Sequence, residues 1–151
     1  MGEEISYQSY LDRHGRLVYR VVGTSMLPLL RQKHDLFIAD RKTKERCRVG
    51  DVVLFKRPHE RYVLHRVIRV NENDYTTLGD HSVNPEMGVT DADILAVMTG
   101  YVRNGRKHRV SERGYRFYTA VWLHTRVPRV WFLRARAAAA RAYRKCFPKR
   151  T

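Results

Sequence analysis

Cysteine is scarce in this sequence of 151 residues, which contains only Cys47 and Cys146. The two are far apart and stand in no Cys-x-x-Cys or Cys/His spacing, so nothing indicates a disulfide framework or a zinc site. We therefore expect a reducing compartment and predict neither a metal nor a cofactor. A chain of this length matches one ordinary domain and buries a core without such cross-links.

Long apolar runs are also lacking. The sequence begins Met-Gly-Glu-Glu, continues through Asp12 and Arg13, and offers no stretch apolar enough for a signal peptide or a membrane span. We expect the protein to be made and kept in the cytoplasm, with association at the inner face of the membrane as the alternative.

Acidic residues are in short supply, because 30 Lys and Arg stand against 15 Asp and Glu and leave a formal net charge of +15. Such an excess favours a polyanion, which includes nucleic acid, an acidic lipid surface and an acidic peptide. Much of the excess lies in residues 101–151. We expect this part of the chain to face the polyanion.

What is present before residue 110 is a series of short apolar segments, rich in branched and aromatic residues. They are typical of strands, and residues 71–74 and 103–106 have the composition of tight hairpin turns. A short helix is expected over 3–13, with Gly15 as its C-cap. The expected strands are 16–22, 35–39, 49–55, 62–70, 75–78 and 94–102. We predict a mainly β domain of antiparallel sheets over residues 1–110.

From residue 111 the pattern becomes helical. Tyr115, Tyr118 and Trp122 recur at helical spacing, and Pro128 separates them from a second helix over about 129–145. The apolar face of that helix consists of Trp131, Phe132, Ala135, Ala138, Ala139, Ala142 and Tyr143, and its basic face of Arg129, Arg134, Arg136, Arg141 and Arg144. We predict a basic helical extension over 111–151 that packs either on the domain or on an anionic membrane surface. No helix-turn-helix or RNA-binding aromatic motif is present, which argues against nucleic acid.

Ser25 lies in a turn, within Gly23-Thr24-Ser25-Met26-Leu27-Pro28. Gly23 can take backbone angles that other residues avoid, and Pro28 fixes its own φ, so the hydroxyl between them is presented rigidly. Most serines in such turns bond only nearby backbone. A serine nucleophile needs a base at neutral pH, and His65 is the one histidine that stands inside an apolar strand segment.

Two carboxylates follow in the chain, Asp80 and Glu86. A carboxylate that orients the imidazole would complete the arrangement of a serine hydrolase. Each feature alone has a structural explanation, because buried histidines commonly bond backbone and carboxylates commonly lie in turns.

In this order the segments resemble the signal peptidase I and S24/S26 group of serine peptidases. The matching pieces are Val22-Gly-Thr-Ser-Met-Leu-Pro28, His34-Asp-Leu-Phe-Ile38, Val49-Gly-Asp-Val-Val-Leu-Phe55, Val63-Leu-His-Arg-Val-Ile68, Thr77-Leu-Gly-Asp80 and Ile94-Leu-Ala-Val-Met-Thr-Gly100. They cover roughly residues 16–102. The resemblance implies a signal peptidase-like antiparallel β-sheet catalytic core.

The resemblance also implies roles for residues. Ser25 matches the acylating nucleophile, and His65 matches the general base of the endoplasmic-reticulum-like branch, where the bacterial branches have lysine. Asp80 matches the family's Gly-Asp aspartate and Glu86 its second acidic residue, so either is expected to orient His65. Asp91 and Asp93 are further candidates for this role.

For substrate binding, the resemblance points to Gly23, Thr24 and Met26 around the nucleophile. The Ser25 amide is the expected first oxyanion donor. Leader peptidases have a hydroxyl two residues earlier, but this chain has Gly23 there, which leaves Thr24 or a water as the second donor. The chain also has His34-Asp35 where the family has Gly-Asp, and Glu86 where it has Asp.

The predicted function is therefore a serine endopeptidase with a Ser25/His65 dyad and an acidic partner. Because no membrane anchor is apparent, we expect its substrate to be an intracellular peptide or small protein, such as a leader peptide. The alternative is a catalytically inactive module that keeps the peptidase fold and binds nucleic acid or an acidic partner.

Overall fold

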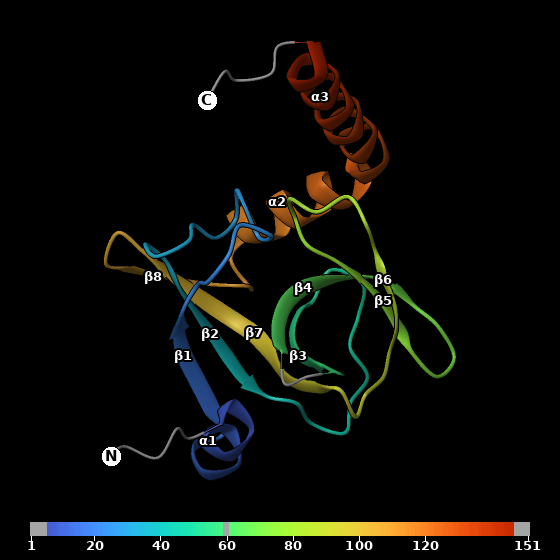
Figure 1. The fold of residues 1–151 in the computed structure, drawn as a ribbon. Helices are drawn as coiled ribbons and strands as arrows, with labels where there is room; N and C mark the ends of the chain where they lie inside the picture. The colour runs from blue at the N-terminus through green and yellow to red at the C-terminus, as the bar shows by residue number, and fades with distance from the viewer. Residues whose placement is uncertain (1–5, 59–60, 147–151) are drawn as a thin grey trace, which may run out of the picture.

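Segments rich in β-branched and aromatic residues form one antiparallel sheet, with helices at both ends of the chain (Figure 1). The computed structural model describes residues 6–58 and 61–146. The strands are β1 (Arg16–Arg20), β2 (Leu36–Arg41), β3 (Val52–Arg57), β4 (Arg61–Val70), β5 (Tyr75–Leu78), β6 (Glu86–Val89), β7 (Ile94–Arg103) and β8 (Arg106–Arg109). The helices are α1 (Tyr7–His14), α2 (Arg113–His124) and α3 (Arg126–Cys146). The expected mainly β class, with a short N-terminal helix and C-terminal helices, is confirmed.

The sheet runs in the order β1-β2-β7-β3-β4-β5-β6, and β8 pairs with β7. Its register shifts inside the β2–β7, β3–β7, β4–β5 and β5–β6 pairs. Such bulges bend strands and increase their twist. The sheet therefore curls, as Figure 1 shows around β3 and β4.

The curl covers both faces of β3 with apolar side chains. Val52 and Leu54 pack into one buried cluster, together with Met26 of the serine turn. Val53 and Phe55 point to the other face and pack into a second cluster. This alternation is the period of two that an extended strand imposes.

The predicted turns and caps are present. Gly15 ends α1 with φ +69 and donates its N–H to the Leu11 carbonyl at 2.8 Å. Asn104 and Gly105, with φ +50 and +74, form the tight turn between β7 and β8. Ser6 caps the start of α1, while residues 3–5 of the predicted helix lie outside the described residues.

One strand and several boundaries differ from the sequence-based expectation. Strand β1 is shorter than the expected 16–22, and β2 and β3 are shifted from the expected 35–39 and 49–55. The segment Glu86–Val89 forms the strand β6, which was not predicted because Glu-Met-Gly-Val has no clear alternation, and its pairing with β5 defines it. Helix α3 begins at Arg126 rather than 129. Pro128 therefore lies in the first turn, where a missing N–H costs no helical hydrogen bond.

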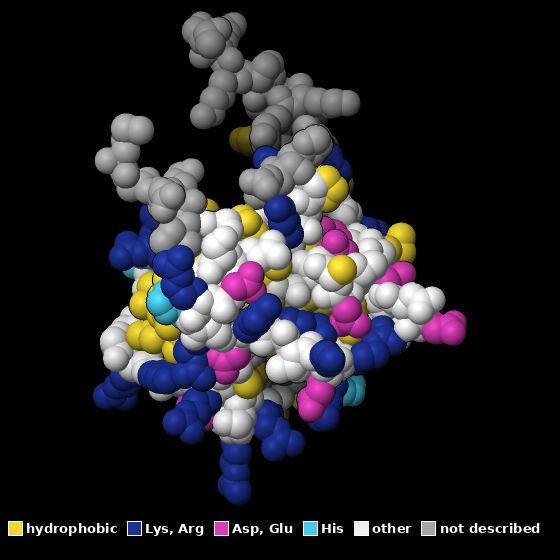
Figure 2. Space-filling view, turned by 90° about the horizontal axis from the view of Figure 1, so that it is seen from below, with side chains coloured by type: hydrophobic (Ala, Val, Ile, Leu, Met, Phe, Trp, Pro, Cys, Tyr) yellow, Lys and Arg dark blue, Asp and Glu magenta, His cyan; other side chains and the backbone are white. Residues whose placement is uncertain are grey.

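Helix α2 covers one side of the sheet through Trp122, which is buried, and α3 then extends away from the sheet (Figure 1). The face seen in Figure 2 carries dark blue Lys and Arg side chains with magenta Asp and Glu scattered among them. Positive charge on this face is thus interspersed with negative charge. Among the described residues, no helix is long and apolar enough to cross a membrane.

Candidate active site

The turn that carries Ser25 is built by its neighbours. Gly23 has φ +84, a conformation that favours glycine. The Leu27 N–H donates to the Thr24 carbonyl at 3.1 Å and closes the turn. Met26 is buried in the core cluster and anchors the side of the turn that faces the sheet. Ser25 is held half-buried between these fixed points.

Asp35 secures the chain that follows the turn. Its buried carboxylate accepts the Arg31 N–H at 2.9 Å, and the guanidinium groups of Arg31 and Arg103 also donate to it. Burial opposes ionisation, but these donors outweigh it and lower the pKa of Asp35. Arg103 also donates to the Leu29 carbonyl, so Asp35 and Arg103 together tie the turn to the β7–β8 hairpin.

His65 and Arg66 are consecutive residues of β4, so their side chains leave opposite faces of the strand. The His65 side chain is buried, with its ring centroid 6.0 Å from that of Phe55. Arg66, which has no exposed surface, lies against the rings of α2 on the other face. The alternation of one strand therefore gives His65 and Arg66 separate surroundings.

Glu86 is the carboxylate that meets His65. Its Oε1 lies 2.9 Å from Nδ1 of His65, although the oxygen is out of line with the ring N–H, so the contact is close in distance but is not an aligned hydrogen bond. Arg57 holds Glu86 from behind: Nε donates to Oε2 at 2.6 Å and Nη2 contacts Oε1. Glu86, with Arg57 behind it, lies on the Nδ1 side of the imidazole. The other ring nitrogen, Nε2, therefore remains available to another partner.

Burial lowers the pKa of His65, and the positive charge of Arg57 acts in the same direction. The carboxylates of Glu86 and Asp80 oppose this shift, with Glu86 the stronger of the two. Since the net pKa lies below the ordinary value, the imidazole is neutral at physiological pH. A neutral ring is the form that can accept a proton.

Asp80 does not contact His65. It forms a bidentate pair with Arg66 at 2.8 and 2.9 Å, and Tyr118 donates to the same carboxylate at 2.8 Å. Asp80 and Arg66 are both buried. Of the two carboxylates that the sequence left as alternatives for orienting His65, only Glu86 is therefore in position, and Asp80 instead joins β4 to α2.

Ser25 and His65 converge at Gly79. A Cβ added to Gly79 would lie 2.7 Å from the Ser25 carbonyl oxygen and 3.0 Å from Nε2 of His65, as well as 2.5 Å from Oγ of Ser82. The next peptide also contributes, because the His81 N–H donates to the Ser25 carbonyl at 2.8 Å. Any side chain at position 79 would press on the serine turn and the imidazole together.

These groups open into a cleft of about 650 Å³, a size typical of ligand sites. Ser25, Met26, His65 and Glu86 line it. Gly23 and Thr24, also predicted to bind substrate, belong to the serine turn but are not among the described residues that line the cleft. Across the described ranges no hydrogen bond links Ser25 Oγ to His65.

Several residues of the site had no distinct signal in the sequence. Arg57 is the last residue of the apolar strand β3, and no motif sets it apart from the other arginines of the chain. Gly79 belongs to the segment Thr77-Leu-Gly-Asp80, and the sequence does not show that its lack of a side chain lets the Ser25 turn and His65 approach each other. Ser82 follows the same motif, and a search for hydroxyls near Gly-Asp could have found it.

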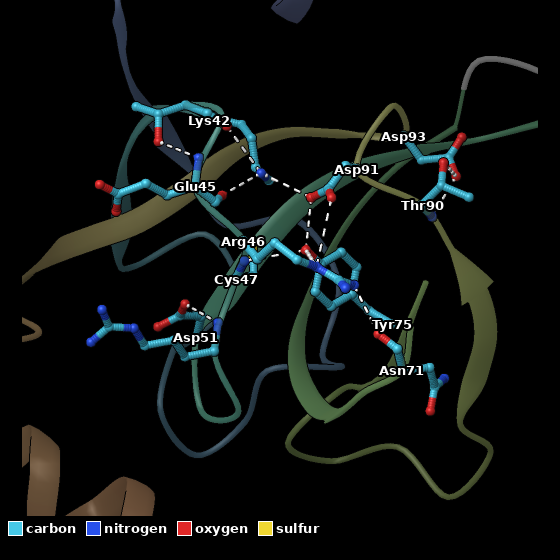
Figure 3. A network of polar contacts seen from close by, with 12 residues as sticks. Lys42, Glu45, Arg46, Cys47, Asp51, Asn71, Tyr75, Thr90, Asp91 and Asp93 are labelled. Carbon is cyan, nitrogen blue, oxygen red and sulfur yellow. Dashed lines mark hydrogen bonds and ion pairs between the residues drawn. The ribbon is translucent and has the colours of Figure 1, made fainter. Parts of the chain in front are cut away.

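Asp91 and Asp93, the further acidic candidates, lie in another network (Figure 3). Asp91 pairs with Lys42 at 2.9 Å and accepts from the Tyr75 hydroxyl at 2.7 Å. Asp93 accepts from the Thr90 N–H and hydroxyl. Both carboxylates therefore serve the loops around β5 and β7 rather than His65. Among the described residues, no three His, Cys, Asp or Glu side chains are grouped to hold a metal ion.

Comparison of the chain with family models, curated proteins and solved structures found no match. The resemblance to signal peptidases therefore rests on the sequence segments, and the chemistry rests on the geometry of the cleft.

Proposed function

We propose that the protein is a serine endopeptidase of the signal peptidase type, which cleaves an intracellular peptide or small protein such as a leader peptide. The observation that carries this proposal is the convergence of Ser25 and His65 in one cleft, with Glu86 behind the imidazole. A hydroxyl, a neutral base and a carboxylate that orients the base are the three parts that acyl transfer needs.

In the first step, Nε2 of His65 takes the proton of Ser25 while Oγ attacks the carbonyl carbon of the substrate. The resulting imidazolium is stabilised by Glu86, which Arg57 keeps in place. His65 then gives the proton to the leaving amine, which leaves an acyl group on Ser25. Water, deprotonated by the same imidazole, hydrolyses this ester and restores the free serine. The bond between Ser25 and His65 forms when substrate closes the cleft, as is common for catalytic hydrogen bonds.

The oxyanion is bound by the Ser25 N–H, with the Ser82 hydroxyl as the second donor. Ser82 approaches the same point above Gly79 as Nε2 of His65, whereas Thr24 is exposed and does not line the cleft. One such donor contributes about 3 kcal/mol to the stability of the transition state.

The remainder of the cleft suits an extended apolar peptide. Its lining is largely apolar and aromatic and includes Met26, Phe37, Leu54, Tyr62 and Leu64. Residues 19–22, at the end of the edge strand β1, also line it. An edge strand can bind an extended peptide through its backbone, and apolar pockets then select alternate side chains.

A binding module without peptidase activity is the second candidate. It is favoured by the net charge of +15 and by the lack of a Ser25–His65 hydrogen bond among the described residues. Affinity for nucleic acid that falls steeply with salt, in a protein that no serine-directed reagent acylates, would identify it.

The deciding experiment is covalent labelling with a fluorophosphonate, followed by intact-mass measurement. We expect one adduct on the wild type, none on Ser25→Ala, and labelling of His65→Ala slowed about 100-fold or more, because a general base contributes about that much. Ser111→Ala, which changes an exposed serine outside the cleft, is the matched control and keeps the wild-type rate. An unlabelled wild type, or a Ser25→Ala variant labelled as fast as the wild type, would exclude Ser25 as the nucleophile.

A further inference from the structure

Helix α3 differs from the remainder of the molecule in its charge. Its 21 residues include seven Lys and Arg and no Asp or Glu. The last acidic residue of the whole chain is Glu112, which precedes α2. The interspersed acidic residues of the sheet surface in Figure 2 have no counterpart on this helix.

The apolar face of α3 is exposed. At 100° per residue, Trp131, Phe132 and Tyr143 share one arc of the helix with four alanines, and Arg129, Arg134, Arg136 and Arg141 share the other. The exposed fractions of Trp131, Phe132 and Tyr143 are 72%, 65% and 66%. The sequence left open whether this face packs on the domain, and in the structure it does not.

The beginning of α3 is fixed against the body. The Arg129 guanidinium lies 4.1 Å from the ring centroid of Trp122, and Arg134 donates to the Val83 carbonyl at 3.2 Å. Beside this contact, Trp131 lines a groove together with Pro85 and with Met87, which is 79% exposed. The exposed apolar surface therefore continues from α3 onto β6, next to Glu86.

We propose that α3 docks along the surface of an anionic lipid bilayer, with the arc of Trp131, Phe132 and Tyr143 in the headgroup region and the exposed Arg136 and Arg141 on lipid phosphates. Large aromatic side chains on one arc and only cations on the other are typical of helices that lie in the interface. Arginine forms bidentate hydrogen bonds with phosphate, and each cation adds to the attraction of an anionic leaflet.

Two other partners, a second copy of the chain and nucleic acid, would each satisfy only one of the two arcs of α3. A second copy of α3 could cover the alanine arc, but it would bring seven further cations without one carboxylate to pair with them. Nucleic acid would neutralise the arginines and leave Trp131 and Phe132 in water. An anionic membrane satisfies both arcs.

The test is co-sedimentation of the full chain with vesicles of phosphatidylcholine containing about 30% phosphatidylserine, at low and high salt. We expect binding to these vesicles, little binding to pure phosphatidylcholine, and weaker binding as salt rises. Arg136→Gln with Arg141→Gln should weaken binding about 30-fold, since each cation near an anionic surface contributes about fivefold.

Trp131→Ser with Phe132→Ser tests the apolar arc and should abolish binding. The matched control is Ala137→Ser with Ala140→Ser, which changes two exposed residues of the basic arc and should bind as the wild type does. Because Trp122 is buried and Trp131 exposed, vesicles should shift the tryptophan emission of the wild type to the blue, and Trp131→Phe should remove that shift while binding persists.

Three outcomes would overturn the proposal. Wild-type protein that stays in the supernatant with phosphatidylserine vesicles excludes a membrane surface of this charge. Binding that is unchanged in the Trp131/Phe132 variant shows that charge alone is responsible. A dimer in sedimentation velocity that this variant abolishes, without vesicle binding by the wild type, assigns the face to a second copy.

Discussion

The protonation of His65 depends on its burial and on neighbouring charges that act with different signs. Burial and the Arg57 charge lower its pKa, and the Glu86 carboxylate raises it. Arg57 also holds Glu86 in place. Arg57 therefore opposes protonation of His65 through its charge, while it positions the carboxylate that favours protonation. Substitution of either one should therefore change the pH dependence of the site in a distinct direction.

In a plot of the Ser25 labelling rate against pH, the rise at low pH is the acid limb. Glu86→Gln and Arg57→Gln should move this limb in opposite directions. The wild-type rate should rise with pH to a plateau, and the midpoint of the rise should lie below about 6.5, because the reactive form has neutral His65 and the pKa of His65 lies below the ordinary value. Glu86→Gln removes a carboxylate and should shift the limb to lower pH. Arg57→Gln removes a cation and should shift it to higher pH. The measurement is the rate of fluorophosphonate labelling between pH 4.5 and 8.5.

The two variants also separate orientation from charge. Both should label more slowly than the wild type on the plateau above pH 7, because each loosens the support behind Nδ1. Lys56→Gln, one position before Arg57 in β3, is the matched change of charge and should leave the limb where it is. If the labelling rates of all variants and the wild type rose at the same pH, the protonation of His65 would not determine the labelling rate.

At the scale of elements, strand β4 presents side chains to the cleft on one face and to helix α2 on the other. His65 faces the cleft, while Arg66 donates to Asp80 and to the Gly50 carbonyl and lies under the rings of Tyr115 and Trp122 in α2. Although burial opposes the charge of Arg66, the hydrogen bond and charge of Asp80 outweigh it and raise its pKa. Arg66 thus keeps its charge, and its contacts with Asp80 and the rings of α2 join the sheet to that helix.

The separation of His65 and Arg66 onto the two faces of β4 could be predicted in part from the sequence. The alternation of β4 follows from its residue pattern, and so does a carboxylate partner for His65. Which carboxylate it is depends on where the chain from residue 79 to 86 turns, and the unpredicted pairing of β6 with β5 decides that. Arg57 and Glu86 meet only because β3 and β6 converge at the cleft, a tertiary contact without a local pattern.

Asp80→Asn should reduce stability much more than reactivity. The free energy of unfolding should fall by about 3–5 kcal/mol, since the substitution leaves the buried Arg66 charge without its partner. At pH 8, where His65 is neutral, the labelling rate of the folded protein should fall less than tenfold. Urea unfolding followed by circular dichroism, with labelling below the transition, measures both.

Glu86→Gln is the companion variant, with the reverse expectation. It changes a partly exposed carboxylate, so its stability should stay within about 1 kcal/mol of the wild type while labelling slows. Tyr118→Phe removes only the hydroxyl that donates to Asp80 and should cost about 2 kcal/mol. If Asp80→Asn instead matched Glu86→Gln in both quantities, Asp80 would belong to the catalytic group.

At the scale of the whole molecule, the sequence was most informative where a pattern is local. The strand periodicity, the Gly15 cap and the Asn-Gly turn predicted the mainly β fold and most of its elements. The order of strands is not local, because β7 inserts between β2 and β3 although it comes late in the chain. The role of Asp35 was missed for the same reason, since Arg103 reaches it from the far end of β7.

Acidification should destabilise the fold in two stages. The folded pKa of His65 is lowered chiefly by burial, so its contribution is complete above the unfolded pKa of about 6.5 and is lost as pH falls through the folded value. The folded pKa of Asp35 is also lowered, because its arginine partners outweigh burial. The contribution of Asp35 is complete above the unfolded value of about 3.9 and is lost as pH falls through the lower folded value.

Two variants assign these stages, and urea unfolding at pH 8, 5.5 and 3.5 measures them. His65→Gln cannot titrate, so its free energy of unfolding should change little between pH 8 and 5.5 while that of the wild type falls. Asp35→Asn should be less stable than the wild type at pH 8, with a difference that narrows by pH 3.5 because the Asp35 carboxylate of the unfolded wild type begins to take up a proton there. A wild type whose stability is equal at pH 8 and 5.5 would contradict a buried neutral His65. The neutral base that the proposed mechanism needs would then be lost as well.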